Sequence, residues 1–338
     1  MPVLSSDPEL DAALDTVAPG LDKWAVVVVV EPVPGGAPPV FRWHQYRQTG
    51  TAQNFWPAST IKIFPAIAAL ELLNEKCVDF DCVVAFSRPG PDGKFAPECA
   101  RTVKEMLSEV FRRSSNEDYT LLLRMVGLDR INRDFLIPAR GFDKSSLMRG
   151  YVLASARPWG YRREDPQRIT IRDAAGRELV HDHKWGGKFY AEERGCTVID
   201  AKTGNVTTPR DLAECLRRLF FHERIPEAER FRLTQAQVDF LRRGGDGLTG
   251  LQTTGPDSYP IAWTNGVEKV FPRATFFHKC GLISDFGLEA AFVDDSRDSG
   301  KQFILVPVVH AGLDGKPPAG PVHIAEMARR IAEWVRGR

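Results

Sequence analysis

A serine and a lysine three positions apart, Ser59 and Lys62, carry the clearest potential for chemistry in this sequence. They lie between Pro57 and an apolar run from Ile63 to Leu73, a pattern that indicates a loop entering a buried helix. The spacing puts both side chains on one helical face, where a neutral amine can take the proton of the hydroxyl. Burial would lower the pKa of Lys62 toward the value that a general base needs. The pair therefore suggests a serine nucleophile with a lysine base.

The Ser-x-x-Lys spacing alone does not show whether the two residues are catalytic or only structural. With 14 Ser and 13 Lys in the chain, about 0.5 Ser-x-x-Lys matches are expected by chance. A serine that caps the helix, followed by a lysine whose stem lies along the helix surface, would give the same pattern. Other parts of the chain must distinguish the two interpretations.

A second pair, Ser114 and Asn116, is the only Ser-x-Asn match in the sequence, against about 0.25 expected by chance. It lies between two predicted helices, one opened by the capping box that starts at Thr102 and one that ends at Gly127. A hydroxyl and a carboxamide at such a break can project into a cleft. A helix cap explains the same two residues, so this alternative stays open.

Three Lys-x-Gly triplets, starting at Lys184, Lys202 and Lys279, compete as the third element, and about one is expected by chance. Lys279 ends an apolar strand predicted over 274–278 and precedes a turn and a returning strand, so it can flank a cleft along a sheet edge. Lys202 instead lies in a turn-rich segment just before a helix cap. The context favours Lys279.

Composition argues against several classes of function. The 338 residues include 45 basic and 44 acidic side chains, a net charge of +1, which gives no support for nucleic acid or an anionic membrane as a partner. The apolar run 24–30 is too short to span a bilayer. Neither a metal nor a cofactor has support, and the oligomeric state is left open. Reduced or buried thiols are predicted at Cys77, Cys82, Cys99, Cys196, Cys215 and Cys280.

Hydrophobic patterning predicts a helix and a hairpin at the start, a helical middle, and strands with a closing helix at the end. Strands from the two ends of the chain would pair into one antiparallel sheet. No secretion signal follows Met1, which predicts a cytoplasmic protein, or a periplasmic or secreted one if a leader has been removed. The predicted elements are helix 7–18, strands 24–31 and 40–48, a loop-rich stretch 77–100, helices 102–113 and 116–126, a hairpin 168–180, a helix from 208, strands 273–278, 287–294 and 302–310, and helix 322–335.

Taken in order, Ser-x-x-Lys, Ser-x-Asn and Lys-x-Gly resemble the active-site serine β-lactamase and penicillin-binding-protein superfamily, particularly the class A enzymes. The resemblance covers most of the chain except 150–206. It implies an α/β plus α fold, β-lactamase-like, in which an antiparallel sheet flanked by terminal helices carries an inserted all-helical lobe. The single unit 1–338 would consist of an α/β lobe at 1–58 and 213–338 and a helical lobe at 59–212, with 150–206 as a long insertion.

The resemblance implies a serine hydrolase or acyltransferase that forms an acyl-serine intermediate on a small-molecule or peptide-like amide, ester or β-lactam. Ser59 would attack, Lys62 would relay its proton and Ser114 would pass a proton to the leaving group. Lys279 would keep the field positive. The resemblance further implies an oxyanion hole formed by the backbone N–H groups of Ser59 and Leu282. The residues implied in substrate binding are Asn116, Cys280, Gly281 and Leu282.

Three departures from the family pattern limit what is carried over. The residue between Ser114 and Asn116 is Ser115 and not the Asp of class A, a position at which other family members vary. Cys280 stands where the family has Thr or Ser, so a hydroxyl that helps bind a substrate carboxylate is missing. After Arg149, where the family has the glutamate and asparagine that hold the deacylating water, the chain reads Gly150-Tyr151-Val152-Leu153. Glu192 and Glu193 are candidate substitutes for the deacylating base, although exposed surface glutamates explain them as well.

Two other functions remain as alternatives. A class A-like β-lactamase or a penicillin-binding peptidase would use the same residues. A catalytically silent binding protein could have kept the fold, which would make the retained Ser59, Lys62, Ser114, Asn116 and Lys279 coincidental. Abnormal reactivity of the Ser59 hydroxyl would separate an enzyme from a binding protein.

Overall fold

A strand of five consecutive valines, 26–30, lies at the centre of the main sheet in this computed structural model, which describes residues 3–195, 202–252, 264–283, 286–310 and 320–338. Over these residues the sheet has six strands, and all neighbours are antiparallel except the first pair. In spatial order they are β1 (Ser5–Ser6), β3 (Val40–Gln45), β2 (Asp22–Glu31), β12 (Lys301–His310), β11 (Phe286–Asp295) and β10 (Thr275–Ile283).

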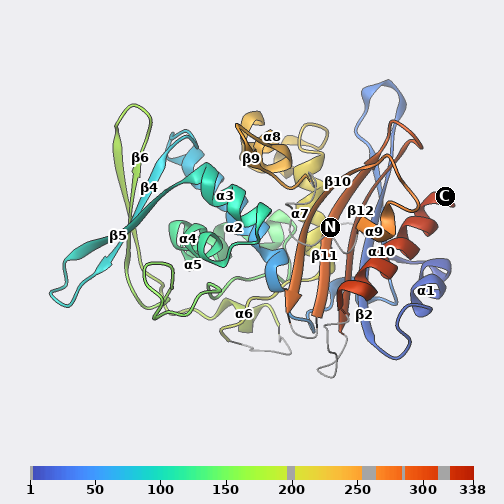
Figure 1. The fold of residues 1–338 in the computed structure, drawn as a ribbon, viewed down its shortest axis with the longest axis horizontal. Coiled ribbons are helices and arrows are strands. Elements are labelled where there is room, and N and C mark those ends of the chain that lie inside the picture. The colour runs from blue at the N-terminus through green and yellow to red at the C-terminus, as the bar shows by residue number, and fades with distance from the viewer. Residues whose placement is uncertain (1–2, 196–201, 253–263, 284–285, 311–319) are drawn as a thin grey trace.

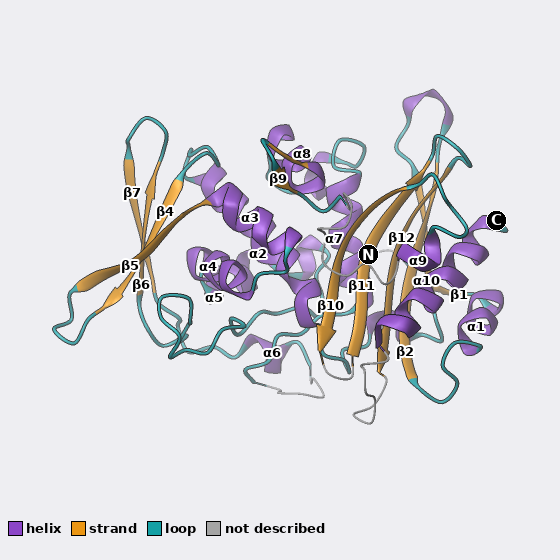
Figure 2. Cartoon of the chain, viewed as in Figure 1, coloured by secondary structure: helices purple, strands orange, loops and turns teal. Residues whose placement is uncertain are grey.

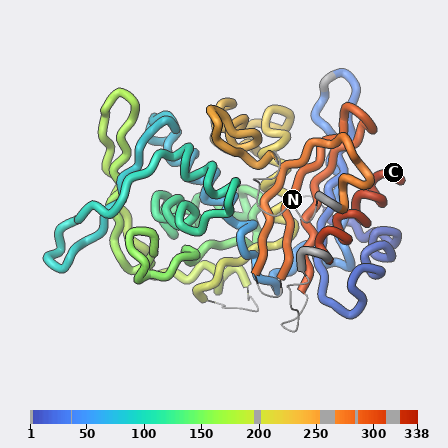
Figure 3. Tube along the Cα trace, in the orientation of Figure 1, coloured from blue at the N-terminus to red at the C-terminus, as the bar shows by residue number. Residues whose placement is uncertain are grey.

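The two ends of the chain meet in this sheet, as predicted. β2 pairs with β12, so that Val28 lies opposite Ile304 and both side chains are buried. Figure 3 shows the blue N-terminal hairpin beside the orange and red C-terminal strands. This pairing lets the intervening residues form a separate lobe while the edge strand β10 faces that lobe (Figure 1).

Helices cover both faces of the main sheet. The first, α1 (Pro8–Asp15), is capped by Asp7, and α10 (Gly320–Arg336) packs against both β12 and α1. The opposite face is covered by α7 (Pro209–Phe220), which begins at the predicted Thr208 cap with Pro at its first position. The division predicted between residues 212 and 213 falls within α7.

The helical lobe is built around α2 (Ile63–Glu75), whose residues from Ile63 to Leu73 are all buried. It packs against α4 (Asn116–Val126), which in turn contacts α3 (Val103–Arg112). α3 begins at the predicted capping box. The Thr102 hydroxyl accepts from the backbone N–H of Glu105, and the Glu105 side chain accepts from the backbone N–H of Thr102. α4 ends at Gly127, as predicted.

A second sheet corrects two expectations. Residues 77–100 are not mainly loop: they hold β4 (Val83–Pro89) and most of β5 (Phe95–Thr102). These strands join the predicted hairpin, β6 (Gln167–Arg172) and β7 (Glu178–His183), in the order β5-β4-β6-β7. Figure 2 shows this sheet on the outer side of the helical lobe, away from the main sheet. The β-lactamase-like architecture is confirmed, but the inserted lobe is not all-helical.

Short elements complete the described chain. No helix in the described ranges is both long and apolar enough to cross a membrane. Five of the six cysteines are free, and Cys196 lies outside the described residues. The remaining elements are α5 (Leu128–Arg130), α6 (Tyr190–Glu193), α8 (Gln235–Arg243), α9 (Thr264–Val267), β8 (Gly244–Gly245), β9 (Leu248–Thr249), a π-helical turn (Ile131–Phe135), and 3-10 turns at Pro34–Gly36, Thr49–Thr51, Ala58–Lys62, Pro138–Arg140 and Glu227–Glu229.

Candidate active site

Ser59 lies in a strained turn at the start of the central helix. The 3-10 turn Ala58–Lys62 leads directly into α2, and the Thr60 hydroxyl closes it by donating to the Pro57 carbonyl at 2.6 Å. Ala58, just before the serine, has φ of 44°, a left-handed conformation that costs a non-glycine residue about 1–3 kcal/mol. The Ser59 side chain is half-buried and lines a cleft. Such strain persists only where surrounding contacts enforce it.

Lys62 is fully buried, and its amine reaches the turn between α3 and α4. Nζ donates to the carbonyl of Ser114 and to Oδ1 of Asn116, the latter at 2.6 Å, and lies 3.3 Å from the Ser114 hydroxyl. Burial, and then the nearby Lys279, lower the pKa of Lys62 to about 6, against the opposing effects of Cys280, Glu117 and Asp118. The amine is therefore mostly neutral at pH 7.

The Ser114 turn is held by its neighbour Ser115. Ser114 has φ of 54°, and Ser115 caps α4 by accepting from the N–H of Asp118 at 3.1 Å. This cap fixes Asn116 at the first position of α4, where its carboxamide meets Lys62. The helix cap and the contacts with the lysine thus come from different residues of the Ser-x-Asn motif. Ser115 is the cap, while Ser114 and Asn116 contact Lys62.

Strand β10 brings the third motif to the same hydroxyl. Lys279 is 2% exposed, and its Nζ donates to the Ser114 hydroxyl at 2.9 Å; burial lowers the pKa of Lys279. Gly281 lets β10 lie against the turn that carries Ser59, because an added Cβ would come within 3.2 Å of the Ala58 Cβ and of the Pro57 carbonyl. A side chain at this position would push the strand away from Ser59.

The remaining strand residues differ in their access to the cleft. Leu282 lines it together with Ser59. The Cys280 thiol is buried, opposite Glu289 on β11, and burial raises its pKa to about 11. The carbonyl of Cys280 accepts from Lys279 at 3.1 Å. The structure therefore gives Cys280 a contact with the lysine through its backbone, and its thiol stays protonated at neutral pH.

The cleft beside Ser59 has a volume of about 600 Å³ and extends along the α3–α4 turn. Its lining includes Trp159, which comes from the insertion, and Arg101. The Arg101 guanidinium stacks over the Trp159 ring at 5.4 Å and pairs with Asp118 at 3.2 Å. The insertion thus adds an aromatic and charged surface to the cleft.

Lys62 is flanked by one group of polar side chains and by one group of aromatic rings. The polar wall consists of Ser114, Asn116 and Lys279. The aromatic wall consists of Tyr119 and Tyr151, whose ring centroids each lie 5.8 Å from Lys62 Nζ. The sequence analysis assigned no role to these tyrosines, although Tyr151 belongs to the run 150–153 that replaces the family's glutamate-bearing run.

Glu192 and Glu193 lie on the short helix α6 with exposed side chains. Glu193 pairs with Lys188 at 3.0 Å, another exposed residue. Within the described ranges, neither glutamate lines the Ser59 cleft or bonds to Lys62. The structure therefore does not bring these candidate bases to the site.

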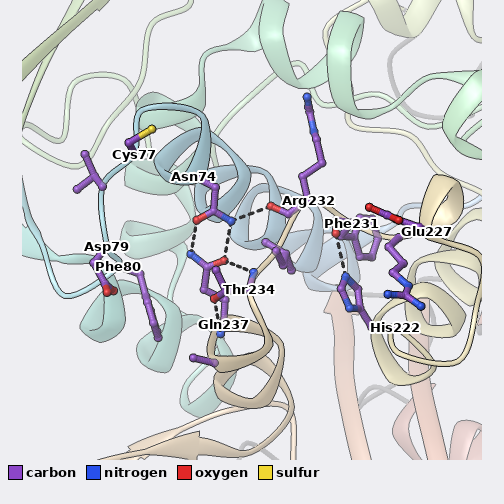
Figure 4. Close-up of a pocket in the computed structure, with 14 residues that line it drawn as sticks. Asn74, Cys77, Asp79, Phe80, His222, Glu227, Phe231, Arg232, Thr234 and Gln237 are labelled. Atoms are coloured by element: carbon purple, nitrogen blue, oxygen red, sulfur yellow. Dashed lines mark hydrogen bonds between the residues drawn. The ribbon is translucent and has the colours of Figure 1, made fainter.

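A separate cavity of about 700 Å³ lies between the end of α2 and α8 (Figure 4). The amides of Asn74 and Gln237 bond reciprocally across it at 2.8 Å in both directions. His222 bonds to the carbonyl of Phe231 at 2.8 Å. These polar groups satisfy one another, so the cavity has the features of packing between helices and not those of a reactive centre.

Comparison with known proteins agrees with this geometry. A family model described as the beta-lactamase enzyme family matches residues 44–335. The chain belongs to this beta-lactamase family. It is a serine hydrolase of the β-lactamase-like superfamily.

Several solved structures share the fold at low sequence identity. PBP-A, as a mutant in an acyl-enzyme complex with penicillin G, has a TM-score of 0.61 at 16% identity over 100% of both chains. A class A beta-lactamase from Bacteroides cellulosilyticus DSM 14838 has a TM-score of 0.60 at 13% identity over 98% of both chains. The beta-lactamase from Sphaerobacter thermophilus DSM 20745 has a TM-score of 0.56 at 17% identity over 97% of both chains. No curated protein sequence matches the chain.

Proposed function

We propose that this family member performs acyl transfer through an acyl-Ser59 intermediate on an amide, ester or β-lactam. The observation that carries the proposal is the fully buried Lys62, with a pKa of about 6, whose amine lies 3.3 Å from the same Ser114 hydroxyl that accepts from a second lysine, Lys279. A neutral amine has two N–H donors and one lone pair. When Lys62 donates to the Ser114 carbonyl and the Asn116 side chain, its lone pair faces the Ser114 hydroxyl, 3.3 Å away, and can accept a hydroxyl proton.

The proposed sequence begins when Ser59 attacks a carbonyl and gives its proton to Lys62. The backbone N–H groups of Ser59 and Leu282 would stabilise the oxyanion by about 3 kcal/mol for each donor. Ser114, which accepts a hydrogen bond from Lys279, would then pass its proton to the leaving nitrogen or oxygen and take one from the protonated Lys62, 3.3 Å away. Asn116 would hold the substrate amide. Trp159 and Arg101 would contact other parts of the substrate, since they also line the cleft.

The aromatic wall favours acylation over rapid β-lactam hydrolysis. Among the described residues, no carboxylate bonds to Lys62, and Tyr151, from the run 150–153 that replaces the family's glutamate-bearing run, has its ring 5.8 Å from the lysine amine. A phenol whose pKa is raised to about 12 does not serve as a base at pH 7. We therefore propose that the acyl-enzyme from a penicillin is long-lived.

Intact-protein mass spectrometry tests the proposal. Wild type and Ser59→Ala would be exposed to a fluorophosphonate and, separately, to penicillin G. We expect both adducts on wild type, neither on Ser59→Ala, and persistence of the penicillin adduct over hours. Absence of the fluorophosphonate and penicillin adducts from wild type would favour the silent binding protein, while rapid loss of the penicillin adduct would favour a true β-lactamase.

A further inference from the structure

The loop that carries Tyr151 is fixed from two sides by buried groups. Oδ1 of Asn205 accepts from the backbone N–H groups of Met148 and Arg149 at 2.7 and 3.1 Å. Nδ2 of the same asparagine donates to the Arg149 carbonyl at 3.0 Å and to the Tyr119 hydroxyl at 3.1 Å. One side chain, 5% exposed, therefore makes four hydrogen bonds and links this loop to helix α4.

The next two residues bring the loop against α4. A Cβ at Gly150 would lie 2.7 Å from both Cγ2 and Oγ1 of Thr120, so only glycine allows this approach. The N–H of Tyr151 donates to the same Thr120 hydroxyl at 3.2 Å. The backbone of Tyr151 is therefore placed by contacts that do not involve its phenol. This leaves the phenol available for another role.

The Tyr151 hydroxyl donates to the Ala58 carbonyl at 2.7 Å, across 93 residues of sequence. Ala58 is the left-handed residue that directly precedes Ser59. A strained residue keeps its conformation only if contacts offset the strain, and this hydrogen bond is such a contact. The bond thus fixes the peptide that leads into the proposed nucleophile.

The Tyr151 ring has a second neighbour, the amine of Lys62, at 5.8 Å. Tyr119 stacks against Tyr151 with centroids 4.9 Å apart, and the two rings close the side of Lys62 opposite the polar wall. The titratable groups that act on Lys62 from the other elements are Lys279 and Cys280 on β10 and Glu117 and Asp118 on α4. Burial affects the pKa of Lys62 more than any of these groups does. Removal of a ring that buries the amine should therefore change this pKa most.

We infer that Tyr151 is a positioning residue for the Ser59 nucleophile: its hydroxyl holds the Ala58 carbonyl, and its ring excludes water from the Lys62 amine. The inference rests on the proposed function for its catalytic meaning. The two contacts are separable, because Tyr151→Phe removes the hydrogen bond and keeps the ring, whereas Tyr151→Ala removes both. The burial that lowers the pKa of Lys62 to about 6 supports the second part.

The first experiment measures the rate of fluorophosphonate adduct formation at Ser59 between pH 5 and pH 9. For wild type we expect the rate to rise with pH through about 6, as the Lys62 amine loses its proton. For Tyr151→Phe we expect a rate about fivefold lower at every pH, the factor for one neutral hydrogen bond, with the same midpoint. For Tyr151→Ala we expect the midpoint to move up by about two pH units, which by itself lowers the rate at pH 7 about tenfold and adds to the fivefold loss from the missing hydrogen bond.

The matched control is Tyr190→Phe, which also removes one phenol hydrogen bond, to Asp129 at 3.0 Å on helix α5, away from the cleft. It should leave both the rate and the midpoint unchanged. If Tyr151→Ala does not fold, Tyr151→Asn introduces the same access of water with a polar side chain. A wild-type rate for Tyr151→Phe would overturn the role of the hydroxyl, and an unmoved midpoint for Tyr151→Ala or Tyr151→Asn would overturn the role of the ring.

A second measurement separates this inference from the proposed function. The Lys62 amine is titrated directly by NMR in full-length protein labelled with ε-¹³C-lysine, with its signal assigned by loss in Lys62→Met. Wild type and Tyr151→Phe should titrate near pH 6, and Tyr151→Ala or Tyr151→Asn clearly higher. If wild type forms no adduct, the proposed function fails, but this titration still decides whether Tyr151 shields the lysine.

Discussion

The two walls around Lys62 differ in how they follow the family pattern. The polar wall keeps a serine, an asparagine and a lysine in the order that the resemblance predicts, and these three side chains all contact Lys62 or Ser114. The aromatic wall replaces the expected carboxylate with the Tyr119 and Tyr151 rings. The groups proposed for acylation are thus retained, while the group needed for hydrolysis is absent from this wall.

The difference has an electrostatic meaning as well. A glutamate beside Lys62 would favour its charged form, whereas two rings favour the neutral amine. In the proposed mechanism, the same difference removes a water-activating base and favours the neutral Lys62 amine that would accept the Ser59 proton. The aromatic wall would therefore affect both the first and the second half of the proposed reaction.

The largest effect should come from breaking the polar wall. Ser114→Ala removes the hydroxyl that accepts from Lys279, and we expect fluorophosphonate or penicillin acylation to slow by about 10²–10³-fold, as for loss of a proton-transfer group. The matched control is Ser115→Ala, one residue on. It removes the cap of α4 and should lower the free energy of unfolding by about 1 kcal/mol, with a much smaller change in rate.

Rates from intact-mass time courses, together with urea unfolding, check both variants. Equal losses of rate for Ser114→Ala and Ser115→Ala would contradict the division of roles between these neighbours. It would mean that the turn matters only as a structural unit.

A smaller effect should follow from adding a carboxylate to the aromatic wall. Tyr151→Glu places an acidic side chain near Lys62, where it can activate water, so we expect the penicillin adduct to disappear about tenfold to 100-fold faster than in Tyr151→Gln. The glutamine variant is the neutral control of the same size, because both substitutions remove the ring and the bond to Ala58. Adduct lifetimes by mass spectrometry that are equal in the two variants would show that the missing charge is not what limits hydrolysis.

Sequence patterns predicted the main sheet and the central helices because their signals are local. The valines at 26–30 and the capping box at Thr102 each specify an element within a few residues. β4 and β5 were missed because Pro89 ends the first strand, Pro97 lies inside the second, and the pairing shifts register after Phe86. Prolines of this kind normally argue against a strand.

The candidate site divides in the same way. Ser59, Lys62, Ser114, Asn116 and Lys279 stand in short motifs with characteristic spacing, so sequence alone could propose them. The roles of Tyr151 and Asn205 depend on hydrogen bonds to segments 93 and 56–57 residues away. No spacing rule connects these positions, and only the folded chain shows that one asparagine holds the loop that places Tyr151.

The last prediction concerns stability, and it tests whether the two walls keep Lys62 neutral. The pKa of Lys62 is about 6 in the folded protein and 10.5 for an ordinary lysine. Between these values the unfolded chain binds one more proton than the native state. The free energy of unfolding therefore increases with pH in this range, by up to about 1.4 kcal/mol per pH unit from this residue. It decreases by the same amount per unit as pH falls toward 6.

Lys62→Met removes this dependence, because methionine does not titrate. We expect the free energy of unfolding of wild type to rise relative to that of Lys62→Met as pH increases from 6.5 to 8.5. Urea unfolding at each pH measures this difference. Lys94→Met, which removes an exposed lysine from the turn between β4 and β5, is the control and should differ from wild type by the same amount at each pH. A difference for Lys62→Met that does not change with pH would mean that the lysine keeps its proton, and then neither wall could prepare it to act as a base.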